Sequence, residues 1–209
     1  MKRNVVPMPP GIHAGLLHRE ARSWVKATRV IGREFLDPKQ ITEMVGPIYF
    51  PLCHGLELAL KAVLAAKGYS KYTLSEVIGH DLKIAYKKAK ADARFPSSDA
   101  LLEKLIQLMA SEHKKHRFRY PGTIWLQLPN IDQCCDAVDR LLDQTKVIVD
   151  VARTKAALRL ALKKLAWDPD LEPRRPLRPR RAAMLRKIWN RQRLGRNRTR
   201  VVSPLKYPR

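Results

Sequence analysis

The pattern of apolar residues changes abruptly at Asp168, and this change limits what the chain can fold into. Up to Trp167, apolar side chains recur at intervals of three and four residues, the period of helices that bury one face. After Asp168, prolines and arginines dominate, and too few apolar side chains remain to offset the entropy lost on ordering the backbone. We therefore predict an all-α domain followed by a basic, largely disordered C-terminal tail.

Prolines, glycines and capping residues divide the helical region into five segments. They predict an up-down helical bundle of about five helices over residues 11–167, with an irregular arm over 1–10 and the tail over 168–209. The segment 117–129 lacks the helical period and is expected to form a turn and an extended piece. The predicted helices are 11–36, 38–67, 73–91, a fourth from Ser97 or Ser98 through Met109, and 131–167.

Two of these helices carry specific expectations about their faces and their continuity. In the first helix, Leu17, Trp24 and Val30 belong to the recurring apolar positions, so they are expected to face the core. In the second, Pro47 and Pro51 have no amide hydrogen to donate, so they are expected to kink or restart the helix.

Capping residues set the expected ends of two further helices. Thr73 and Glu76 have the spacing of a capping box, which predicts that one helix starts there and runs to about Ala91. Asn130 is the predicted N-cap of the last helix. At about 1.5 Å per residue that helix would span about 50 Å, which is longer than a compact bundle needs.

The chain is strongly basic, with 42 Lys and Arg against 19 Asp and Glu and a net charge of +23. Residues 168–209 hold 14 of the basic residues and only 3 of the acids, which leaves 28 against 16 for residues 1–167. This imbalance predicts an anionic partner such as nucleic acid.

Cysteine usage and hydropathy indicate the compartment. The three cysteines, Cys53, Cys134 and Cys135, are odd in number and two are adjacent, so they form neither a disulfide framework nor a CxxC metal pair. No leader-like apolar segment is recognisable, and no run is expected to reach the length of a membrane span. We therefore expect a cytoplasmic protein with no membrane partner.

Three motifs occur in a fixed order along the helical region. Residues 54–62 read HGLELALKA, residues 79–82 read GHDL, and residues 119–122 read RYPG. Over roughly residues 20–165 this order resembles the HEPN superfamily of prokaryotic helical domains, which often carry H-x-x-E-L-x-L-K-A, H-D-L and R-Y-P elements.

The resemblance implies a helical bundle that is commonly a homodimer. Many members of that superfamily are metal-independent endoribonucleases of toxin–antitoxin or phage-defence systems, and others bind RNA or pair with a nucleotidyltransferase without catalysis. The ribonuclease members carry an Arg followed, after four to six residues, by a His. None of the six histidines of this chain has an Arg at that spacing upstream.

His80, Asp81 and Arg119 are the candidate catalytic residues. A metal-independent ribonuclease needs a base of near-neutral pKa to remove the 2′-OH proton, and histidine suits this role. Asp81 would orient His80, and Arg119 would stabilise the charged phosphorane, with Arg117 as an alternative. The competing interpretation is that His80 and Asp81 hydrogen-bond near a helix start and only fix its packing.

His54, Glu57 and Lys61 lie along one stripe of the second predicted helix. They form either a buried polar network at a cleft or dimer contact, or a solvated face with one ion pair. Glu57 and Lys61 have the favourable spacing for such a pair.

Residues 117–120 alternate arginines with aromatic rings, so Arg117 and Arg119 could grip phosphates while Phe118 and Tyr120 stack on bases. The alternative is that both rings belong to the core. In the tail, Trp189 could stack on a base, and the cations around it would bind RNA through salt-sensitive contacts. The alternative is that the tail is only solvated or is docked on an acidic partner. The candidate RNA-contacting residues of the tail are Arg180, Arg181, Arg186, Lys187, Trp189, Arg191 and Arg193.

The sequence thus predicts an RNA-binding or RNA-processing protein that is a metal-independent endoribonuclease if it is catalytic. Its expected partners are RNA, a second copy of the chain, and a nucleotidyltransferase or antitoxin protein. No cofactor and no metal are expected, because the sequence shows no spaced cluster of ligands. Two alternatives remain: a non-catalytic module that pairs with a nucleotidyltransferase-type protein, and a general nucleic-acid-binding protein driven by its tail.

Overall fold

The computed structural model describes residues 8–34, 38–96, 99–119 and 129–167, and it confirms the predicted helical bundle. The chain divides into two units, Met1–Ala161 and Leu162–Arg209, and the bundle belongs to the first. No strand occurs among the described residues. The helices are α1 (Pro10–Glu34), α2 (Pro38–Ala66), α3 (Leu82–Lys90), α4 (Ala100–Lys114) and α5 (Ile131–Trp167), with a π-helical turn η1 (Thr73–Ile78) and a 3₁₀ turn η2 (Arg117–Arg119).

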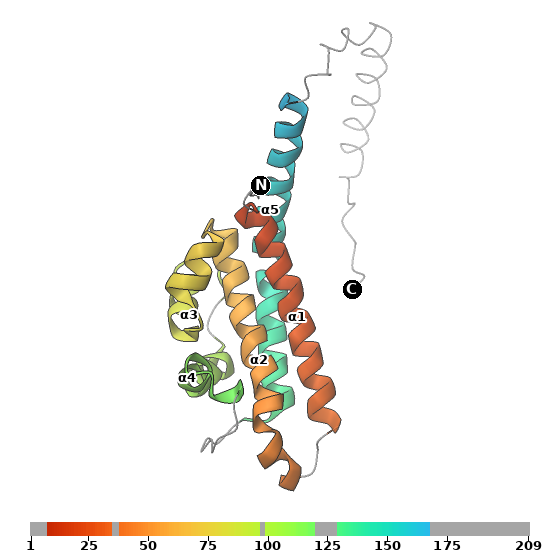
Figure 1. Ribbon diagram of the computed structural model, residues 1–209, viewed down its shortest axis with the longest axis vertical. Helices are drawn as coiled ribbons and strands as arrows, with labels where there is room; N and C mark the ends of the chain where they lie inside the picture. Colours follow the sequence, from red (N-terminus) through yellow and green to blue (C-terminus); the bar gives the residue numbers. More distant parts are fainter. Residues whose placement is uncertain (1–7, 35–37, 97–98, 120–128, 168–209) are drawn as a thin grey trace, which may run out of the picture. The chain divides into compact units, whose positions relative to one another are not determined.

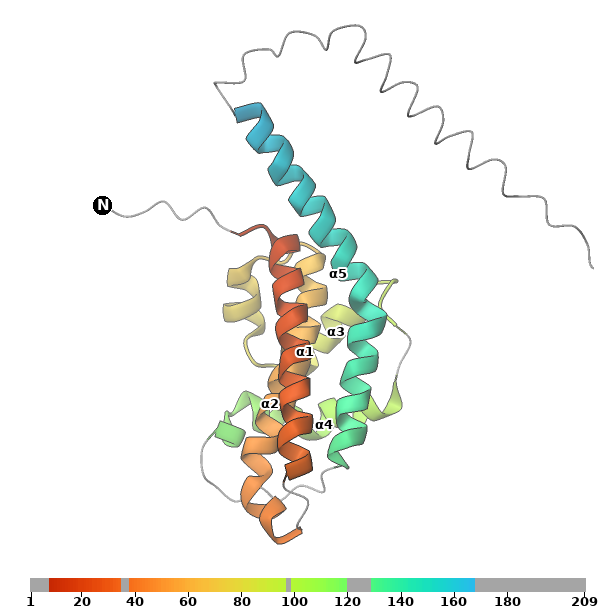
Figure 2. The same ribbon diagram turned by 90° about the vertical axis from the view of Figure 1, so that its right-hand side faces the viewer.

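Three long helices, α1, α2 and α5, lie side by side, and α1 runs antiparallel to both of the others (Figures 1 and 2). Glycines allow the close approach of α1 to its neighbours. A Cβ on Gly11 would lie 2.3 Å from the carbonyl oxygen of Ala152 in α5, and a Cβ on Gly55 would lie 3.2 Å from that of Ala21 in α1. The shorter α4 is seen nearly along its axis in Figure 1, so it crosses the long helices.

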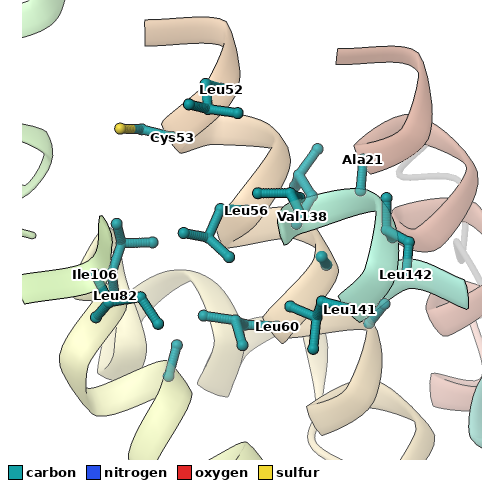
Figure 3. Close-up of a cluster of buried hydrophobic side chains, with 14 of the residues drawn as sticks. Ala21, Leu52, Cys53, Leu56, Leu60, Leu82, Ile106, Val138, Leu141 and Leu142 are labelled. Carbon is teal, nitrogen blue, oxygen red and sulfur yellow. The ribbon is translucent and has the colours of Figure 1, made fainter. Parts of the chain in front are cut away.

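Helix α2 contributes the largest share of one buried hydrophobic cluster, to which every other helix of the bundle also contributes residues (Figure 3). From Leu56 to Ala65 every residue of α2 is buried, including Glu57 and Lys61. The apolar residues that recur along this helix, Leu52, Leu56 and Leu60 among them, therefore belong to the core. Other labelled residues are Ala21 from α1, Leu82 from α3, Ile106 from α4, and Val138, Leu141 and Leu142 from α5.

The burial of α2 also bears on the expectation that no run reaches the length of a membrane span. The stretch Val45–Ala66 is long and apolar enough to cross a membrane. Judged by length and composition alone, the expectation that no run reaches that length is therefore wrong. However, 89% of its most apolar window is buried inside the bundle. Core helices that are covered on all sides have the same composition.

The buried face of α1 differs from the predicted one. Trp24 is 36% exposed and Val30 is 62% exposed, whereas Leu17 is buried as expected. The buried face consists mainly of small or polar residues, because the close approach of α2 and α5 leaves room for little else. These residues are Ala14, Leu17, His18, Ala21, Val25, Thr28 and Gly32.

The single helix expected over 73–91 is wrong, because the chain breaks between η1 and α3. Gly79 has a φ of +55°, which interrupts the helical path. Asp81 then caps α3, with its Oδ1 accepting from the amide of Ile84 at 3.0 Å. The predicted capping box is also absent, since Ser70 rather than Thr73 provides the local cap by accepting from the amide of Thr73.

Of the remaining expectations about helix ends, the cap of α5 is confirmed, whereas a restart of α2 at its prolines does not occur. Asn130 caps α5 by accepting from the amides of Asp132 and Gln133 at 2.9 and 3.2 Å, as predicted. Asp99 caps α4, and the predicted caps Ser97 and Ser98 lie outside the described residues. Helix α2 continues through its two prolines without a restart.

Candidate functional site: a histidine cluster around a buried glutamate

Two histidines bind one buried carboxylate and two more lie nearby, and we call His54, Glu57, His80, His113 and His116 the histidine cluster. His54 and Glu57 come from α2, and His113 comes from the last turn of α4. His80 lies in the break between η1 and α3, and His116 lies just beyond α4.

Glu57 is the centre of the cluster. Its side chain is 3% exposed and accepts hydrogen bonds on both oxygens. Oε1 accepts from Lys61 Nζ at 2.6 Å, and Oε2 accepts from His80 Nδ1 at 2.8 Å and from His113 Nε2 at 2.6 Å. A buried carboxylate with three donors is satisfied as a polar group and fixes the rings around it.

Backbone breaks bring His80 to this carboxylate and His116 against the His80 ring. The interruption at Gly79 places His80 over α2, whereas the continuous helix expected from the sequence would have carried the chain straight past it. His116 has a φ of +58°, a left-handed conformation that ends α4 and turns the chain into η2. The two rings meet edge to face, with centroids 4.6 Å apart.

The protonation of the cluster is set by burial and by its charges. Burial alone would raise the pKa of the Glu57 carboxyl, but the hydrogen bond from His113 and the charge and hydrogen bond of Lys61 hold that pKa well below its usual range. Burial lowers the pKa values of His54 and His116, and the nearby Arg119 charge lowers them further. Glu57 is therefore ionised, and His54 and His116 favour the neutral form.

Arg119 lies at the edge of the cluster on an aromatic surface. Its guanidinium is 5.0 Å from the ring centroid of Phe50, and the Phe50 ring is stacked on His54 at 5.9 Å. Trp24 packs edge-on against His54 at 5.2 Å. Arg119 is exposed, so a cation faces solvent beside the imidazoles.

Two of the three predicted catalytic residues, His80 and Arg119, lie in this region, but Asp81 does not orient His80. The carboxylate that holds the His80 ring is Glu57. Asp81 caps α3 and accepts from Lys114 Nζ at 2.8 Å, so its side chain is committed to the fold. That part of the prediction is wrong because the chain turns at Gly79, which brings α2 rather than the next residue against His80.

The predicted nucleic-acid-binding residues divide into three groups. Arg117 is exposed and pairs with Glu112 at 3.2 Å, whereas Phe118 is buried, so that its ring belongs to the core. Arg119 is the exposed cation described above. Tyr120 and all the candidate residues of the tail lie outside the described residues.

Sequence reasoning missed Glu57 and His113 as partners of His80. Glu57 was placed on a stripe that was either buried or solvated, and the buried alternative is confirmed. An available signal was the position of Glu57 inside a run of α2 that is apolar except for Glu57 and Lys61, where an acid must be paired. His113 is 56 residues from Glu57, and no local spacing reveals the contact.

Three atoms of the cluster could hold a metal ion. One oxygen of Glu57 and one ring nitrogen each of His80 and His113 all lie within 4.8 Å of one another. The sequence showed no such cluster, because the three donors are separated by 23 and 56 residues.

The cysteines are not candidate nucleophiles. Cys53, next to His54 in sequence, is a free thiol buried in the core, as are Cys134 and Cys135. Burial raises the pKa of the Cys53 thiol far above neutrality and raises that of Cys134 to about 11. Thiols that stay protonated are poor nucleophiles and poor metal ligands.

Comparison with known proteins found no relative of this chain. Neither the models of protein families, nor the curated proteins, nor the solved structures contain a match to the chain.

Proposed function

We propose that this is a HEPN-like, RNA-binding and RNA-processing protein whose site is the histidine cluster. The carrying observation is that the buried Glu57 binds Nδ1 of His80, whose side chain is 34% exposed. A carboxylate on Nδ1 fixes the ring and its tautomer and leaves Nε2 as the proton acceptor. The motif resemblance supports the same class, since His80, Glu57 and Arg119 all stand in the motifs that carry it.

The proposed reaction is metal-independent cleavage of an RNA phosphodiester. Nε2 of His80 removes the 2′-OH proton, the 2′-oxygen attacks phosphorus to form a 2′,3′-cyclic phosphate, and the bond to the 5′-oxygen breaks as that oxygen takes up a proton from solvent. Arg119 contacts the phosphate and stabilises the charge that develops on it. Glu57 is a positioning residue, because it acts through His80.

Charge around the cluster favours an anionic substrate. Lys114, Lys115, Arg117 and Arg119 are exposed over the short stretch that follows His113. A dense local set of cations raises the concentration of a polyanion at the surface and speeds its association. RNA rather than DNA follows from the 2′-OH that this chemistry needs.

A non-catalytic interaction module is the second candidate, and an exposed apolar surface on α5 favours it. Val147, Val151 and Leu158, spaced by four and seven residues on one face of the helix, are 70%, 42% and 60% exposed. Exposed apolar side chains at this density on one helix are typical of surfaces that contact another protein. In this alternative the partner is a nucleotidyltransferase or antitoxin protein, or a second copy of the chain, in the cytoplasm.

The test is cleavage of mixed RNA by the full chain in the presence of EDTA, beside His80→Ala and the control His13→Gln. His13 lies on α1 and outside the cluster, so His13→Gln should cleave like the parent. Loss of cleavage in His80→Ala alone supports the proposal, and a Glu57→Asp variant should then shift the pH profile of the rate rather than RNA affinity. No cleavage by the parent at equimolar RNA refutes catalysis.

A deletion of residues 168–209 separates the tail-driven alternative. If RNA binding vanishes with the tail while the cluster is intact, the general nucleic-acid-binding interpretation leads. If binding persists with a shallower dependence on salt, the cluster and its cations carry the recognition.

A further inference from the structure

We propose that Glu57, His80 and His113 form a binding site for a divalent transition-metal ion of the zinc class, and that an ion bound there withdraws His80 from its function. Imidazole nitrogen and carboxylate oxygen are the donors that zinc takes in three-ligand sites, with the remaining position left to water. The three donors converge from α2, the η1–α3 break and α4, so only the folded chain offers them together.

The distances suit an ion after small side-chain movements. Donors about 2.0–2.1 Å from a tetrahedral zinc ion are about 3.4 Å from one another. In the structure Oε2 of Glu57 is 2.8 Å from Nδ1 of His80 and 2.6 Å from Nε2 of His113, and no pair of the three donors exceeds 4.8 Å. The ion would replace the hydrogen atoms that now join the rings to the carboxylate.

The surroundings supply the outer partner and the entry path that such a site needs. Lys61 holds Oε1 of Glu57 at 2.6 Å, which leaves Oε2 directed at the two rings. Glu57 and His113 are 3% and 2% exposed, so their donors are shielded from competing water. His80 is 34% exposed and provides access from solvent. Because the region is basic, the affinity has to come from the donors themselves rather than from net charge.

An ion at this site changes the chemistry of His80. When Nδ1 of a neutral imidazole binds zinc, the single ring proton resides on Nε2. Nε2 is then a donor and cannot accept the 2′-OH proton, and Glu57 is engaged by the metal. This consequence rests on the proposed function, and it predicts that zinc inhibits cleavage, whereas the metal site itself does not depend on that function.

Metal binding is measured on the full chain without RNA. Protein freed of metal by chelator competes for Zn²⁺ with a chromophoric chelator, and Co²⁺ serves as a spectroscopic probe of coordination. We expect one ion per chain with a visible Co²⁺ absorption band. Affinity should fall at least about tenfold in His80→Ala and in His113→Gln, while His13→Gln should bind like the parent.

His80→Ala is the deciding variant, because it is expected to fold: His80 is partly exposed, and its loss leaves Lys61 and His113 bound to Glu57. Far-UV circular dichroism checks that the variant is folded. Absence of stoichiometric binding in the parent, or equal binding in the parent and His80→Ala, overturns the metal site. A protein that binds zinc but cleaves no RNA keeps the metal site and loses the proposed function. Cleavage in EDTA that excess Zn²⁺ leaves unchanged overturns the inhibition.

Discussion

The ion pair between Glu57 and Lys61 can be tested by removing its negative partner. Both side chains are buried, at 3% and 10% exposure, and the atoms are 2.6 Å apart. Glu57→Gln keeps the shape of the side chain but leaves the Lys61 ammonium without an anion, and breaking a buried pair in this way costs about 3–5 kcal/mol. For a chain of this size that cost lowers the melting temperature by about 6–20 °C.

The measurement is urea unfolding followed by far-UV circular dichroism, with Lys114→Met as the control. Lys114 pairs with Asp81 at 2.8 Å but is 61% exposed, so its loss should cost no more than about 1 kcal/mol. The double variant Glu57→Gln/Lys61→Met removes both charges and should be about 0.5–3 kcal/mol more stable than the two single effects predict. The reasoning is refuted if Glu57→Gln costs no more than Lys114→Met, or if the single effects add.

Two further predictions concern the contact of α1 with α5. Burial lowers the pKa of His18, although its hydrogen bond to the Leu142 carbonyl at 2.9 Å acts against that shift. As the pH falls, the unfolded chain therefore binds the proton first, so the free energy of unfolding is full above the unfolded pKa and decreases as the pH drops below it toward the folded pKa. Urea unfolding at several pH values should show a smaller decrease in His18→Gln than in the parent. Gly11→Ala places a Cβ 2.3 Å from a backbone oxygen and should lower the free energy of unfolding in urea by about 1–3 kcal/mol. The control Gly15→Ala meets only the movable side chain of Arg153 and should change that free energy little. Equal effects of the two variants would contradict the close packing inferred for α1 and α5.

The helices and their main core face could be read from the sequence because they depend on local periodicity. The helical period of the apolar residues up to Trp167 and the cap at Asn130 needed only residue spacing and the chemistry of capping, and both are confirmed. The face of α1 could not be read in this way. Val30 is 62% exposed, and Trp24 packs its ring on His54 at the rim of the α1–α2 contact and stays 36% exposed, because the close approach of the helices selects for small side chains at its centre.

Only part of the candidate site could be predicted from the sequence. His80 and Arg119 were identified from residue chemistry and from the motifs, and both lie at the cluster. Their partners could not be identified, because hydrogen bonds between residues 23 and 56 positions apart depend on how the helices pack. Asp81 was the obvious neighbour of His80 in sequence, yet the backbone turn at Gly79 commits it to the cap of α3.

By itself, the sequence determined a helical bundle, its basic charge and the boundary of its apolar pattern at Asp168, since each follows from composition and from the period of a helix. The tertiary structure alone decided that Glu57 is buried and binds His80 and His113. A carboxylate inside a largely apolar helix must find donors to be buried, but which donors it finds depends on how α4 packs on α2 and on the break at Gly79 that directs the ring of His80 toward α2.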